Sequence, residues 1–125
     1  MKSKWLLILM ALGPARAYAD ARSMNCNFMT WDANGIVLEH KRIEDVGPRS
    51  TYFVEWKFEP YEVRAWSVYL NHQTGIKMEI RNRLANTREE LGPFTNEDDP
   101  SRIEPYVNRL VRTPWGDMDL MCRLN

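Results

Sequence analysis

Two cysteines are the residues of this chain whose chemistry is easiest to interpret. Cys26 and Cys122 are the only cysteines in the sequence and lie far apart in it. A redox pair favours C-x-x-C spacing, and a structural zinc site needs more Cys or His ligands at short intervals than the two histidines here supply. We therefore expect one structural disulfide between Cys26 and Cys122, and we predict no metal and no cofactor.

Groups suited to catalysis are scarce. The sequence contains no G-x-S-x-G motif that would place a nucleophilic serine on a sharp turn. Its two histidines, His40 and His72, are interpreted as ordinary surface or half-buried side chains. A pair of glycosidase carboxylates must be held about 5 to 10 Å apart in a cleft, which a domain this small rarely builds. A small hydrolase is thus the least favoured function, and we expect a non-catalytic protein.

One polar run carries four oxygen-bearing side chains, which are candidate ligand contacts: Asn96, Glu97, Asp98 and Asp99. Together with Asp32 and Asn34 they could supply the six to eight oxygens that calcium requires. The spacing of an EF-hand loop is absent, however. We therefore favour a loop of solvated charge and keep calcium as the alternative.

Tryptophans are abundant for a domain of this size. Trp66 lies in the run 61–70, both faces of which carry apolar side chains, and Trp115 lies in a Pro-Trp-Gly turn. Core packing, with the run 61–70 covered on both faces, is the simpler interpretation. A sugar or peptide stacking on Trp66 or Trp115 is the alternative, because indole rings favour half-wet contacts. Trp115 is the residue that we expect to be most exposed.

The N-terminus has the order of a cleavable signal peptide. Lys2 and Lys4 precede the apolar stretch 5–13, and the small-residue pattern at 17–19 follows. We predict cleavage after Ala19, which leaves 20–125 as a single domain in the periplasm or outside the cell, where disulfides form. Because a membrane span needs roughly 20 apolar residues, no stable membrane insertion is expected after cleavage.

Charge argues against one class of partner. The full chain has 17 basic and 17 acidic residues, and three of the basic ones lie in the predicted signal peptide. The remainder is therefore mildly acidic. Because affinity for a phosphate backbone comes from clustered Lys and Arg, a nucleic-acid partner is not expected.

Alternation of apolar and polar residues predicts the elements that must position these groups. It is clearest in the runs 51–59, 76–83 and 117–124, and the turn signals Asn34-Gly35, 71–75 and 113–116 separate the runs. We expect an all-β fold: an antiparallel sandwich or a small barrel of about seven strands. Cys26 and Cys122 fall on inward faces, so the disulfide should join the N-terminal strand to the C-terminal one.

The segment 82–105 departs from this pattern. Thr87 and Glu90 have the spacing of a helix capping box, which predicts one short helix over 87–91. The rest is a long loop, and such loops in small domains are functional or mobile.

These observations favour an exported, disulfide-bonded binding module. It would engage a protein partner, as an inhibitor does, through the long loop or through an unpaired strand edge. The alternative is a module that binds carbohydrate or cell wall through an exposed tryptophan.

Overall fold

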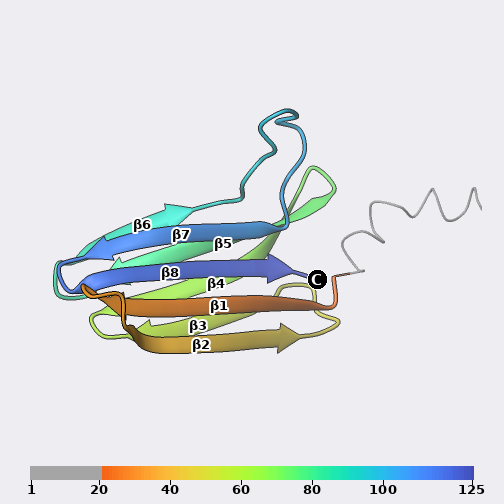
Figure 1. Cartoon of the computed structure of the whole chain (residues 1–125). Helices are drawn as coiled ribbons and strands as arrows, with labels where there is room; N and C mark the ends of the chain where they lie inside the picture. Colours follow the sequence, from red (N-terminus) through yellow and green to blue (C-terminus); the bar gives the residue numbers. More distant parts are fainter. Residues whose placement is uncertain (1–20) are drawn as a thin grey trace, which may run out of the picture.

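The computed structural model describes residues 21–125, which form strands and no helix (Figure 1). The predicted signal peptide over 1–19 lies outside the described residues. In the described part of the chain, eight strands follow one another: β1 (Ser23–Asp32), β2 (Val37–Val46), β3 (Phe53–Phe58), β4 (Tyr61–Leu70), β5 (Gln73–Asn82), β6 (Thr87–Leu91), β7 (Tyr106–Thr113) and β8 (Gly116–Leu124).

The strands form two antiparallel sheets of four. The first sheet has the order β2-β1-β8-β7 and the second the order β3-β4-β5-β6. Figure 1 shows the two sheets stacked as layers, with the strand axes of one sheet roughly aligned with those of the other. The fold is thus an antiparallel β-sandwich, which confirms the sandwich and excludes the barrel among the two architectures that the sequence predicts.

Inward-facing side chains of both sheets form the core. Alternate residues of β3, β5 and β8 are buried, as the three clearest sequence runs predict, because period-two alternation places every second side chain between the sheets. Four aromatic rings form a row through this core, with successive centroids 5.0, 5.5 and 5.5 Å apart. The row consists of Phe28, Trp56, Phe58 and Trp115.

The helix predicted over 87–91 is wrong, because this segment is strand β6. It pairs with β5 in register, Arg81 opposite Arg88 and Glu79 opposite Glu90. Ion pairs between the two strands support it, including Arg88 with Glu79 at 3.3 Å. Since β6 lies at a sheet edge with most of its side chains exposed, it lacks the apolar alternation that identifies an inner strand. This extra strand also raises the number above the predicted seven.

Two turns differ in detail from the prediction. At Asn34-Gly35 only the glycine has a left-handed φ, at 80°, and the Asp32 carboxylate accepts hydrogen bonds from the amides of Asn34 and Ile36 at 2.9 Å each. The predicted loop 71–75 is shorter, because only residues 71 and 72 connect β4 to β5, both with positive φ.

Candidate functional site

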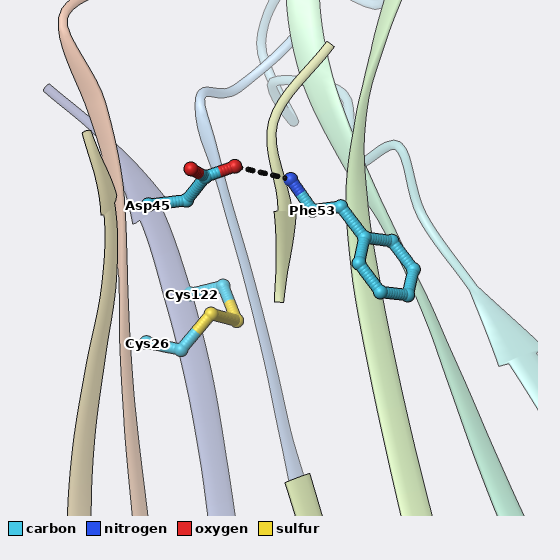
Figure 2. The surroundings of a disulfide bond; sticks show 4 residues. All are labelled: Cys26, Asp45, Phe53 and Cys122. Atoms are coloured by element: carbon cyan, nitrogen blue, oxygen red, sulfur yellow. Dashed lines mark hydrogen bonds between the residues drawn. A yellow bond between two sulfur atoms is a disulfide. The ribbon is translucent and has the colours of Figure 1, made fainter. Parts of the chain in front are cut away.

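The two cysteines form the predicted disulfide. Cys26 in β1 and Cys122 in β8 are direct partners in the antiparallel pair, with Cα atoms 4.0 Å apart. The bond lies on the core side of the first sheet (Figure 2), and the two residues are only 2% and 0% exposed. It therefore fastens the first strand to the last inside the core. Such a bond indicates a non-reducing environment, extracellular or periplasmic.

Near the disulfide, side chains of β2 bond to β3 across the edge of the sandwich. The Phe53 amide donates a hydrogen bond to Asp45 Oδ2 at 2.8 Å (Figure 2), and Trp56 Nε1 donates one to Glu39 Oε2 at 2.9 Å. Asp45 also forms an ion pair with Arg49 at 2.7 Å. One edge of the second sheet is thus covered by side chains of the first.

The connection between β6 and β7 is the longest in the described part of the chain, and it is ordered as a hairpin. We call residues 93–104 the finger. Thr95 and Ile103 form a β-bridge, and the Asn96 amide donates a hydrogen bond to the Arg102 carbonyl at 2.9 Å. Figure 1 shows this segment rising beyond the sheets beside the β4–β5 hairpin. The long loop that the sequence predicts is therefore an ordered hairpin that projects from the sandwich.

Two of the four predicted ligand contacts hold the tip of the finger together. Asn96 Oδ1 accepts hydrogen bonds from the amides of Asp98 at 2.8 Å and Asp99 at 3.1 Å. Asp99 Oδ1 accepts one from the Ser101 hydroxyl at 2.6 Å and one from the Ser101 amide at 3.2 Å. These two bonds, the hydroxyl first, lower the pKa of Asp99. Asn96 and Asp99 thus act within the chain.

The other two predicted contacts are available to a partner. The carboxylates of Glu97 and Asp98 are exposed and form no hydrogen bond or ion pair with any residue in 21–125. With Phe94, Glu104 and Tyr106 among others, they line an open hollow of about 680 Å³. The finger therefore presents free negative charge on an ordered backbone.

The finger is anchored to β5. Gln73 Nε2 donates a hydrogen bond to the Ser101 carbonyl at 2.7 Å, and Gln73 Oε1 accepts one from the Ile103 amide at 2.7 Å. At its base Gly92 has a φ of 88°, and a β-carbon there would collide with the carbonyl of Ile76. No sequence pattern marks Gln73 as an anchor, because its partners are backbone groups about 30 residues away.

The structure does not support the calcium alternative. Asp32 and Asn34 lie in the β1–β2 turn, at the end of the sandwich opposite to the finger (Figure 1). The Asp32 carboxylate is occupied by backbone amides. Among residues 21–125, no group of three or more His, Cys, Asp or Glu side chains is placed to hold a metal ion.

The two candidate tryptophans do not form one site. Trp66 lies on the outer face of the second sheet and is half-buried there, so β4 is not covered on both faces as predicted. Trp115 is not the exposed residue that its turn position predicts, because it packs against Phe58 at the end of the core. Its ring closes one end of the aromatic row.

Trp66 has an aromatic neighbour that was not among the predicted contacts. Phe53 is its direct partner on β3 and is 49% exposed, so the two rings lie on the same outer face. Along the same face Arg64 bonds to Glu55 at 2.8 Å, a contact that raises the pKa of Arg64. The sequence does carry a signal for this neighbour, because Phe53 is the one apolar residue on the otherwise polar face of the run 51–59.

Neither histidine belongs to a catalytic arrangement within the described residues. His40 Nε2 lies 2.6 Å from Asn27 Oδ1, and the ring of His72 meets that of Tyr69 edge-on. Neither is hydrogen-bonded to a serine or a carboxylate in residues 21–125.

Residues 21–125 contain no helix long and apolar enough to cross a membrane.

Comparison with known proteins adds no assignment: no family model, no curated protein and no solved structure matches this chain.

Proposed function

We propose that this protein is an exported, non-catalytic binding module that engages a protein partner through the finger, in the manner of an inhibitor loop. The observation that carries the proposal is the ordered hairpin of residues 93–104, which stands beyond the sheets with the carboxylates of Glu97 and Asp98 exposed. The predicted signal peptide over 1–19 would deliver it to the periplasm or the exterior, where the disulfide forms.

An ordered finger binds more tightly than a flexible loop of the same residues. Ordering a loop on binding costs free energy, and here the bridge and the side-chain bonds of Asn96 and Asp99 have already fixed the backbone. The finger carries four carboxylates and one guanidinium. A partner with a basic surface is therefore favoured, since complementary charge accelerates encounter and selects the partner.

The test is capture of a partner from an envelope extract of the source cells by the disulfide-bonded protein. The double variant Glu97→Gln/Asp98→Asn removes two free charges but none of the bonds that order the finger. We expect it to lose the captured partner while its melting temperature stays unchanged. A matched control, Asp117→Asn/Asp119→Asn on β8, removes the same charge far from the finger and should retain the partner.

Two outcomes would contradict the proposal. Capture by the finger variant equal to that of the unchanged protein excludes the finger as the binding element. Equal loss in the finger variant and the control means that net charge, and not this site, governs capture. Export is tested separately, because N-terminal sequencing of the exported protein should begin at Asp20.

A second candidate function, carbohydrate binding, is favoured by the paired rings of Phe53 and Trp66. Adjacent aromatic residues on an exposed sheet face can stack on the faces of sugar rings. Titration with soluble cell-wall and plant glycans should then change tryptophan fluorescence, and Trp66→Phe should weaken this response. Retention of the response in Trp66→Phe, or no response to any glycan, excludes this site.

A further inference from the structure

Strand β2 is the longest edge strand of the sandwich, and most of its side chains are exposed. It pairs with β1 on one side only, and seven of its ten residues are exposed. Leu38 and Val46 are 51% and 58% exposed. Long exposed edge strands carry unpaired backbone groups that can add a further strand. The β1–β2 register is irregular at Thr30/Trp31, opposite the start of β2, and regular from Glu39 to Val46.

The middle of β2 has a charge order that is complementary to its own reverse. Lys41 and Arg42 precede Ile43, and Glu44 and Asp45 follow it. When an antiparallel second copy is centred on Ile43, Arg42 faces the second copy's Glu44 and Lys41 faces the second copy's Asp45. Both kinds of charged pair in this register join opposite signs, and opposite charges across neighbouring strands stabilise a sheet. Because Asp45 already bonds Phe53 and Arg49 of its own chain, the two Arg42–Glu44 pairs supply most of this attraction.

Backbone geometry excludes the register with the greatest overlap. In an antiparallel ladder the groups of alternate residues point to the same side, so a twofold pairing must be centred on one residue. Full overlap of the two strands would be centred between Lys41 and Arg42 and is therefore not allowed. Pairing centred on Lys41 or on Arg42 opposes like charges. Pairing centred on His40 would use Val37 and Leu38, where the β1–β2 register is irregular. The centre at Ile43 remains.

We propose that β2 binds β2 of a second copy of this chain in that register, so that the two first sheets join into one continuous sheet. The ladder comprises residues 40–46 of each copy, which lie within the regular part of the strand. The proposal does not depend on the finger or on its partner. Because the attraction is partly ionic at an exposed edge, added salt should weaken the dimer.

Arg42 and Glu44 provide a test that separates pairing from folding. Both side chains are exposed and form no hydrogen bond or ion pair within residues 21–125. Sedimentation equilibrium of the disulfide-bonded protein, from micromolar to millimolar concentration, should show a monomer–dimer equilibrium. Arg42→Glu alone, or Glu44→Arg alone, should raise the dimer dissociation constant at least about tenfold, because two attractive pairs become repulsive.

Restoration is the decisive result. The double variant Arg42→Glu/Glu44→Arg should dimerise again, and an equimolar mixture of the two single variants should form the heterodimer. Arg112→Glu, on the edge strand β7 at the other side of the sheet, is the control and should leave the dissociation constant unchanged. A protein that is monomeric at millimolar concentration overturns the proposal. So does a dimer that Arg42→Glu leaves intact or that the double variant fails to restore.

Discussion

Replacing both cysteines with alanine is expected to remove much of the stability of the domain. Cys26 and Cys122 are 96 residues apart in sequence. The chain-entropy cost of closing a loop of that length in the unfolded state is about 4.7 kcal/mol. Residual structure in the unfolded chain reduces this value, so we expect the free energy of unfolding to fall by about 3 to 5 kcal/mol. Small domains have a total of about 5 to 15 kcal/mol.

Urea unfolding followed by tryptophan fluorescence measures the difference between the unchanged protein and Cys26→Ala/Cys122→Ala. A loss below about 1 kcal/mol would refute the loop-closure reasoning. A second measurement remains informative where the variant does not fold. Because both cysteines are buried, dithiothreitol should reduce the native protein no faster than it unfolds. Rapid reduction of the folded protein would contradict the burial.

Three further perturbations test the core, the base of the finger and its tip. Phe28→Ala should lower the free energy of urea unfolding by about 3 to 5 kcal/mol, because it empties a fully buried site stacked on Trp56. Gly92→Ala should cost more than about 1 kcal/mol at a φ of 88° and should increase limited proteolysis of the finger. For Asp99 the folded pKa lies below its ordinary 3.8. The hydrogen bonds from Ser101 to Asp99 should therefore persist above pH 3.8 and be lost as the pH falls through the folded pKa of Asp99. The amide resonance of Ser101 measures this loss. Ser101→Ala should raise the pKa of Asp99.

The strands with one well-buried face could be predicted from the sequence, because such burial imposes alternation. The runs 51–59, 76–83 and 117–124 became β3, β5 and β8, and the inward parity of Cys122 placed the disulfide correctly. Each of these strands has neighbours on both sides or a covered edge. The pattern therefore reports the packing of side chains against the opposite sheet.

The edge strands β2 and β6 could not be predicted in the same way, because few of their side chains are buried. Seven of the ten residues of β2 are exposed, so its sequence shows no clear alternation. In β6 almost every side chain is exposed, so a local capping pattern predicted a helix that pairing with β5 overrides. Where little is buried, polar sequences that suit a strand and a helical turn look alike, and only the neighbouring strand decides between them.

The sequence predicts the polar run 96–99 as one group of candidate ligand contacts. The structure divides this group according to the hydrogen bonds that each side-chain oxygen accepts. Asn96 and Asp99 accept hydrogen bonds from the chain itself, whereas the carboxylates of Glu97 and Asp98 bond no group in residues 21–125. These bonds depend on the hairpin geometry of the finger, which spacing alone does not specify. Deleting 96–99 would therefore remove the order of the finger together with its free charge. Neutralising Glu97 and Asp98 alone separates the two contributions, because the backbone that presents them stays fixed.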